Sequence, residues 1–191
     1  DENNFNAYFY LGKIYNSLQK NDKALTSYRK ALSINPNHAD TYANLGSTLI
    51  LNSQFDEAEK NCKKAILLDP NQALAYYNLG NIYKNTKEFE KAKKNYERTV
   101  KINPKNFLAL CNLGNIFQET AQHIEAIKYY KKAIEIKPDF AEVFNNIGNS
   151  YRKIGKMKDA ELNYRNALKY KENFPAAYSN LLLLQSYILV D

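Results

Sequence analysis

The chain has 191 residues, of which 45% are hydrophobic, and a formal net charge of +7 at pH 7. This length and composition predict a soluble, folded protein with a hydrophobic core. No run of roughly 18 apolar residues occurs, so we expect no membrane span, and the first residues do not resemble a signal peptide. The two cysteines, Cys62 and Cys111, have the spacing of neither a disulfide framework nor a metal site. We therefore expect an intracellular protein, cytoplasmic or nuclear.

Glycine and proline recur with one period. Five of the six glycines and four of the prolines follow an interval of 34 residues: Gly12, Gly46, Gly80, Gly114 and Gly148, with Pro36, Pro70, Pro104 and Pro138. Two infrequent residue types with the same period indicate tandem repeats. With the glycine at position 8, the repeats span residues 5–38, 39–72, 73–106, 107–140 and 141–174, and residues 175–191 form a partial repeat or closing helix. We predict one solenoid domain over residues 1–191.

Each repeat is expected to contain two helices. In the first repeat, Tyr8, Leu11 and Tyr15 at positions 4, 7 and 11 have the spacing of an amphipathic helix, which we call the A helix. A second helix, the B helix, carries Ala24 at position 20 and Tyr28 at position 24. Small residues at positions 8 and 20 let the two helices approach closely, and the side chain at position 24 fills the space beside them. Proline at position 32 ends the B helix because it lacks an amide hydrogen.

This pattern resembles the tetratricopeptide repeat over residues 5–174. Small residues stand at positions 8 and 20, aromatic residues at positions 4, 11 and 24, and proline at position 32. Two departures are Glu172 in the proline position and Cys62 in an aromatic position. The resemblance implies an all-α fold, a right-handed α-α superhelix of antiparallel helix pairs whose A helices line a concave groove. It also implies a scaffold for protein–protein interaction that binds extended peptide.

The groove predicted from this resemblance is rich in carboxamides. Positions 2, 5, 6, 9, 12 and 13 of the A helix face it, so the predicted site comprises Tyr10, Asn44, Asn78, Asn112, Asn146 and Asn180 at position 6, Asn81, Asn115 and Asn149 at position 9, Tyr77 at position 5, and Lys84 and Arg152 at position 12. A carboxamide can pair with both groups of a peptide backbone. Alternatively, these asparagines bracket adjacent A helices or are solvated. Positions 2 and 6 lack the paired basic residues of a clamp for acidic chaperone tails.

The asparagine ladder also resembles the substrate-binding superhelix of O-linked N-acetylglucosamine transferases and their Spindly-type relatives. Residues 177–187 resemble the segment that joins the repeats to the catalytic domain in such proteins. This resemblance implies the substrate-recruiting arm of a protein O-glycosyltransferase, with the catalytic domain beyond Asp191. The alternative is an assembly or co-chaperone-type scaffold without a linked enzyme, acting through its convex face or terminal helix.

The last predicted helix is apolar nearly all round, with Leu181, Leu182, Leu183, Leu184, Ile188, Leu189 and Val190. A terminal helix should present a polar face to water. We therefore expect either that more chain follows or that residues 175–191 mediate self-association.

Basic residues form a column at positions 25 and 26 of the B helices: Arg29, Lys30, Lys63, Lys64, Arg98, Lys131, Lys132 and Arg165. Phosphate binding requires such a footprint, but acidic residues are interspersed, so a solvated convex surface is the preferred interpretation and nucleic acid is not expected as a partner. His38 in a loop and His123 in a turn form no catalytic or metal-binding constellation with the cysteines. We predict a non-catalytic chain without cofactor or metal.

Overall fold

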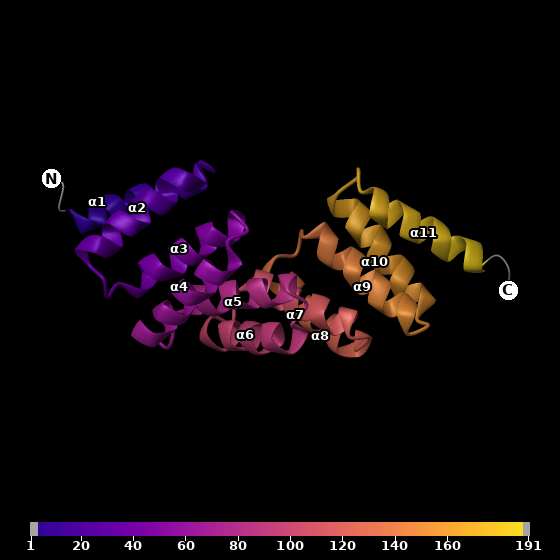
Figure 1. Ribbon diagram of the computed structural model, residues 1–191. Coiled ribbons are helices and arrows are strands. Elements are labelled where there is room, and N and C mark those ends of the chain that lie inside the picture. Colours follow the sequence, from indigo (N-terminus) through magenta and orange to yellow (C-terminus); the bar gives the residue numbers. More distant parts are fainter. Residues whose placement is uncertain (1–3, 189–191) are drawn as a thin grey trace. The chain divides into compact units, whose positions relative to one another are not determined.

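The computed structural model describes residues 4–188, with side chains up to residue 186. Within these residues the chain folds into eleven α-helices and no β-strand (Figure 1). The helices are α1 (Phe5–Ser17), α2 (Asn21–Ile34), α3 (Ala39–Leu51), α4 (Phe55–Leu68), α5 (Ala73–Asn85), α6 (Phe89–Ile102), α7 (Phe107–Glu119), α8 (His123–Ile136), α9 (Ala141–Lys153), α10 (Met157–Tyr170) and α11 (Pro175–Ile188). The all-α solenoid of tandem helix pairs is confirmed.

The helix boundaries follow the 34-residue period. Every odd-numbered helix, an A helix, begins at the first position of a predicted repeat, and every B helix ends two residues before position 32. The intervening residue is extended, with φ between −126° and −145°, as expected before proline. Lys171 is extended in the same way although Glu172 follows it. Proline therefore favours this helix end but is not required for it.

Each A helix is joined to its B helix by a turn with one left-handed residue. This residue stands at position 15 and is Gln19, Ser53, Lys87, Ala121 or Gly155, with φ between +56° and +78°. The next N–H bonds back to position 11, for example from Lys156 to the carbonyl of Tyr151 at 3.0 Å. This bond closes the helix end in the manner of a Schellman motif. Only repeat 5 has glycine where the backbone would favour it.

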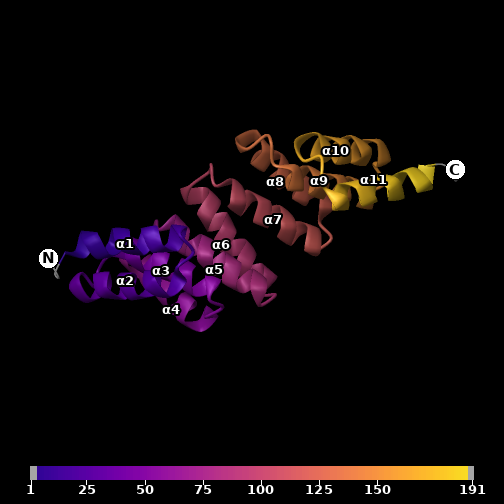
Figure 2. The ribbon, with the colours of Figure 1, turned by 90° about the horizontal axis from the view of Figure 1, so that it is seen from above.

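The chain divides into two compact units, Asp1–Asn103 and Pro104–Asp191. The first contains the helix pairs α1/α2, α3/α4 and α5/α6, and the second contains α7/α8, α9/α10 and α11 (Figure 2). In each unit an A helix packs on its own B helix and on the B helix that precedes it. The prediction of one continuous domain over residues 1–191 stays a prediction.

The pairing of small and aromatic residues inside each repeat is close. Tyr130 is fully buried, and a Cβ added at Gly114 would lie 2.4 Å from its ring. Gly12, Gly80 and Gly148 have the same relation to Tyr28, Tyr96 and Tyr164, at 2.4 to 2.5 Å. In repeat 2 the corresponding contact is 2.6 Å, from Gly46 to the Sγ of Cys62. The ring at position 24 thus lies directly on the backbone of the A helix, as the sequence predicts.

The closing helix α11 has one buried face and one exposed apolar face. Leu181 and Leu184 pack in one cluster with Ala160 and Tyr164 of α10. By contrast, Leu182 is 66% exposed and Leu183 is 44% exposed. The sequence also predicts that Ile188, Leu189 and Val190 add to the apolar surface of this helix, but these residues lie outside the described side chains.

Candidate functional site

The asparagines at position 9 are hydrogen-bonded to the tyrosines at position 24 of their own repeats. The Tyr96 hydroxyl donates to Asn81 Oδ1 at 2.8 Å and that of Tyr164 to Asn149 Oδ1 at 2.9 Å. The Tyr130 hydroxyl has two acceptors within reach of its one proton, Asn115 Oδ1 at 2.7 Å and Gln118 Oε1 at 2.8 Å. A hydroxyl at the end of a buried ring needs an acceptor. Each of these asparagines therefore supplies its side-chain oxygen as an acceptor for a tyrosine hydroxyl at the edge of the core.

The first two repeats lack this bond. Repeat 1 has Lys13 at position 9, and the buried hydroxyl of Tyr28 has no partner among the described residues. Repeat 2 has Ser47 at position 9 and Cys62 at position 24. Every repeat with asparagine at position 9 thus has tyrosine at position 24, a correlation that is visible in the sequence and could have predicted the bond.

Four of the asparagines at position 6 donate from their amide nitrogens instead, and Asn44 and Asn78 are the two in the first unit. Asn78, only 3% exposed, donates to the Ala43 carbonyl at 2.9 Å and to Ser47 Oγ at 2.7 Å, and so bridges α5 and α3. Asn44 donates to the Asp40 carbonyl of its own helix at 2.7 Å. For Asn78 the geometry favours the alternative of bracketing adjacent A helices, because a ligand has little access to it.

In the second unit, two hydrogen bonds from predicted residues connect neighbouring A helices. Asn146 Nδ2 on α9 donates to Asn115 Oδ1 on α7 at 3.3 Å. Asn180 Nδ2 on α11 donates to Asn145 Oδ1 on α9 at 3.0 Å. Asn112 is half-buried on α7. These two bonds link α7 to α9 and α9 to α11, and the half-buried asparagines on the three helices form the polar A-helix surface of this unit.

Arg152 lies at the edge of this surface. It is half-buried, and the nearby guanidinium group partly opposes the burial that raises the pKa of Tyr164. Its Nε is buried without a partner among the described residues. Arg152 thus places a fixed positive charge one turn from Asn149.

The remaining predicted site residues belong to the first unit. Tyr10 is 57% exposed, and the Lys13 ammonium lies 5.9 Å from its ring centroid. Tyr77 is half-buried with its ring 5.9 Å from that of Tyr96. Lys84 is half-buried, and burial lowers the pKa of its ammonium group. Tyr10 lies on α1, whereas Tyr77 and Lys84 lie on α5, two repeats further along the chain.

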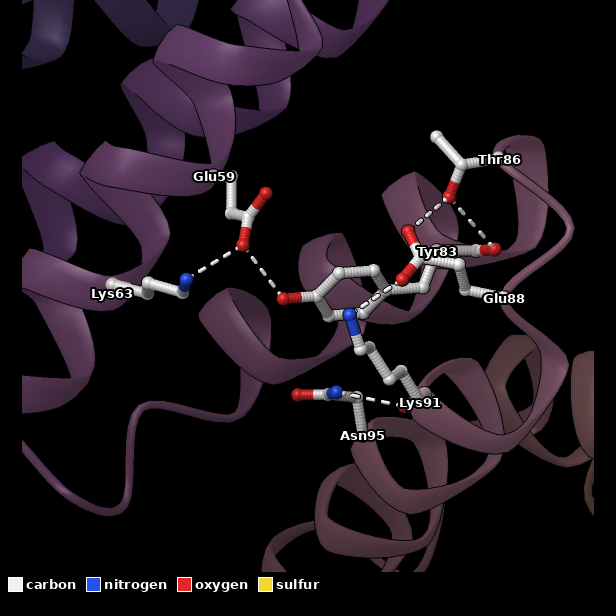
Figure 3. A network of polar contacts seen from close by, with 7 residues as sticks. All are labelled: Glu59, Lys63, Tyr83, Thr86, Glu88, Lys91 and Asn95. Carbon is white, nitrogen blue, oxygen red and sulfur yellow. Dashed lines mark hydrogen bonds and ion pairs between the residues drawn. The ribbon is translucent and has the colours of Figure 1, made fainter.

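A polar network fixes the junction of repeats 2 and 3 (Figure 3). Tyr83 on α5 donates from its hydroxyl to Glu59 Oε1 on α4 at 2.7 Å, and Lys63 Nζ lies 2.6 Å from the same oxygen. The hydrogen bond from Lys63, followed by that from Tyr83, lowers the pKa of Glu59. Lys91 on α6 pairs with Glu88 at 2.5 Å and lies 5.2 Å from the Tyr83 ring centroid. The sequence pattern gave no sign of this network, because its members come from three helices.

The basic column on the B helices is partly neutralised. Arg29 pairs with Glu57 at 2.9 Å, Lys63 with Glu59, and Arg165 with Glu161 at 2.7 Å. These partners are the interspersed acidic residues. The absence of a nucleic-acid partner stays a prediction.

The cysteines and histidines occupy structural positions. Burial raises the pKa of the Cys62 thiol to about 12 and that of Cys111 to about 11. His38 accepts from the N–H of Thr41 at 3.2 Å and caps α3, whereas His123 is the first residue of α8 rather than part of a turn. Among the described residues, no three His, Cys, Asp or Glu side chains are grouped so that they could hold a metal ion. No described helix is long and apolar enough to cross a membrane.

Family models identify the repeats. A model of the tetratricopeptide repeat matches residues 39–72, 73–106 and 107–140, a second matches residues 129–161, and a model of the TPR repeat matches residues 12–53. The chain belongs to the tetratricopeptide repeat family. Tetratricopeptide repeat proteins are scaffolds for protein–protein interaction, and this chain has that architecture.

Solved tetratricopeptide repeat structures resemble the chain over most of its length. A structure of MamA is 30% identical, with 85% of this chain and 95% of MamA covered and a TM-score of 0.75. YrrB, described as a TPR protein with an unusual peptide-binding site, is 20% identical, with coverages of 94% and 92% and a TM-score of 0.74. PilF of Pseudomonas aeruginosa is 21% identical, with coverages of 96% and 91% and a TM-score of 0.78. A comparison with the curated proteins gave no match.

Proposed function

We propose that the chain binds an extended peptide segment of a partner protein on the A-helix surface of its second unit, formed by α7, α9 and α11. The observation that carries the proposal is the set of half-buried amides on these helices, Asn115, Asn146, Asn149 and Asn180, with Arg152 one turn from Asn149. Asn115 and Asn146 are bonded to each other, and Asn180 is bonded to Asn145. Their hydrogen-bonding capacity exceeds what the fold uses. The peptide-binding site described for YrrB supports the proposal, because YrrB has the same architecture.

The resemblance to glycosyltransferase arms receives no support from the comparisons, and the proposal does not include it. Binding requires no catalytic step on this surface. Intracellular localisation stays a prediction.

The test begins with a displayed library of random-sequence dodecamer peptides, from which the peptides that bind the full chain are selected. The tightest peptide is then labelled, and its Kd is measured by fluorescence anisotropy. The variant Arg152→Ala with Asn149→Ala should weaken binding at least tenfold, because it removes a charged and a neutral hydrogen-bond partner. Asn163→Ala is the matched control, because Asn163 lies on α10 and donates to the Asp159 carbonyl of its own helix at 2.8 Å. An unchanged Kd in the double variant would contradict the proposal.

A second candidate is self-association through α11. Leu182, Leu183 and Tyr178 are exposed on this helix, and exposed apolar side chains in one cluster favour an interface. Light scattering should then show a dimer that Leu182→Glu dissociates and that Ser33→Glu, at an exposed serine on α2, leaves intact. Leu184 is unsuitable for this test because it is fully buried. A monomer at all concentrations would exclude the candidate.

A further inference from the structure

The turn between α9 and α10 is the most basic of the five turns that join an A helix to its B helix. From position 12 to position 19, residues 152–159 have one acidic residue, Asp159, and four basic residues, Arg152, Lys153, Lys156 and Lys158. Their net charge is +3, whereas the same positions of the first four repeats have net charges of +1, −2, +1 and −2 in chain order. Positive charge is therefore concentrated on one turn of the second unit.

The fold does not neutralise the lysines of this turn. Lys153, Lys156 and Lys158 are exposed, and in the part of the chain that the structure describes none of them has an ion-pair partner. The basic column on the B helices differs, because ion pairs neutralise part of it. An exposed cluster of one sign attracts an oppositely charged partner. This turn is therefore a candidate interaction surface.

One apolar side chain beside these lysines is not used by the fold. Leu162 is 58% exposed and lies one helical turn after Lys158 on the same face of α10. In each of the other four repeats this position holds threonine or lysine: Thr26, Lys60, Lys94 and Lys128. Repeat 5 thus combines unpaired positive charge with an exposed leucine, where the other repeats have a polar side chain.

This combination distinguishes between kinds of anionic partner. Arginine binds a protein carboxylate best, because its planar guanidinium group pairs with both oxygens. The one arginine of the turn, Arg152, is half-buried, and its Nε is buried. Lysine is a flexible point charge, which suits charge spread over a surface. The headgroup layer of an anionic bilayer has such charge and also accepts apolar side chains at its inner boundary.

We propose that the α9–α10 turn is a peripheral docking surface for an anionic membrane. The ammonium groups of Lys153, Lys156 and Lys158 contact lipid headgroups, and Leu162 enters the boundary between headgroups and acyl chains. Lys158 and Leu162 lie about 6 Å apart along α10, so both reach the membrane when the first turns of α10 lie flat on it. The contact is separate from the peptide binding proposed above, which uses the asparagines of the A helices.

The test is co-sedimentation of the full chain with vesicles of phosphatidylcholine that contain about one third phosphatidylserine, beside vesicles of phosphatidylcholine alone. The chain should bind the anionic vesicles only, and added salt should weaken binding. Each lysine near an anionic surface contributes about fivefold to the affinity. The triple variant Lys153→Ala, Lys156→Ala and Lys158→Ala should therefore lower the partition coefficient at least tenfold, with an unchanged circular dichroism spectrum.

The matched control removes the same charge from the first unit. It replaces three other exposed lysines that have no ion pair among the described residues: Lys60→Ala, Lys64→Ala and Lys94→Ala. Its partition coefficient should stay within about twofold of that of the unmodified chain, because these lysines lie on α4 and α6. An equal loss in the control and in the turn variant would show that net charge alone drives binding, and the proposal would be wrong.

Leu162→Ser separates a membrane from a soluble acidic partner. It should lower the partition coefficient about threefold or more, because less apolar surface leaves water on binding. Binding to soluble polyglutamate, measured by fluorescence anisotropy, should not depend on Leu162. Absence of sedimentation with anionic vesicles, or an unchanged partition coefficient in the triple lysine variant, would overturn the proposal. An unchanged partition coefficient in Leu162→Ser would also overturn it, since the turn would then recognise charge alone, as an acidic polypeptide supplies.

Discussion

Repeat 5 and repeat 1 have the same buried tyrosine on the same glycine but differ in what faces its hydroxyl. In repeat 5, Asn149 accepts from Tyr164. In repeat 1, Lys13 stands in place of asparagine, and the Tyr28 hydroxyl is buried without a partner among the described residues. Both repeats nevertheless form the same helix pair. The ring packing therefore builds the hairpin, and the asparagine adds stability and an oriented amide.

The largest expected effect concerns the packing of a tyrosine ring on a glycine, which repeats 1 and 5 share with repeats 3 and 4. Gly114→Ala would place a Cβ 2.4 Å from the fully buried Tyr130 ring, so we expect a loss of about 3 kcal/mol in unfolding free energy. In Gly46→Ala the close contact is with the Sγ of Cys62 at 2.6 Å, whereas the nearest backbone atom, the Ala58 carbonyl oxygen, is 3.5 Å away, so this change should cost less. Urea denaturation followed by circular dichroism measures both. Equal effects would show that the aromatic ring is not what limits the approach of the helices.

The next effect concerns the bond that repeat 1 lacks. Asn149→Ala leaves the Tyr164 hydroxyl without its acceptor, which should cost about 2 kcal/mol of stability. Adding Tyr164→Phe should recover most of this loss, since the hydroxyl that needs a partner is removed. Denaturant unfolding of the two single variants and the double variant gives the coupling energy. Additive losses would mean that the hydrogen bond contributes nothing to stability.

A smaller effect comes from removing the tyrosine hydroxyls alone. Tyr28→Phe should leave the unfolding free energy unchanged or raise it slightly, because the hydroxyl lost has no described partner. Tyr164→Phe should cost about 1 kcal/mol, the net value of a hydrogen bond. Thermal unfolding of the two variants tests the difference. If both variants lose the same stability, the contrast between the two repeats is refuted.

The smallest effect concerns the turns. Ala121→Gly in repeat 4 should gain about 0.5 kcal/mol, because φ is +58° there and glycine adopts this region without strain, although it has more freedom to lose on folding. Gly155→Ala in repeat 5, where nothing lies within 4 Å of an added Cβ, should lose about 1 kcal/mol. Chemical denaturation of the two variants should give opposite signs. The same sign would mean that the turns differ in more than their backbone angle.

The sequence by itself determined the repeat boundaries, because glycine and proline act through the backbone and their positions translate directly into helix starts and ends. The contact of Gly114 with Tyr130 was likewise expected from a small and a large residue at matched positions. The turn residues were harder to predict. Only Gly155 indicates a left-handed backbone angle from its residue type. The other four turns adopt the same angle because the packing of the helix pair requires it, at Gln19, Ser53, Lys87 and Ala121.

Only the tertiary structure decided the role of each asparagine. The sequence placed Asn78 and Asn146 at the same position of their repeats, yet the Asn78 nitrogen donates to Ala43 and Ser47 whereas the Asn146 nitrogen donates to Asn115. A residue's spacing places it on a helix face but does not say which neighbouring atoms lie within hydrogen-bonding distance. A carboxamide can turn either end toward them, so its free end is known only when the adjacent helix is in place.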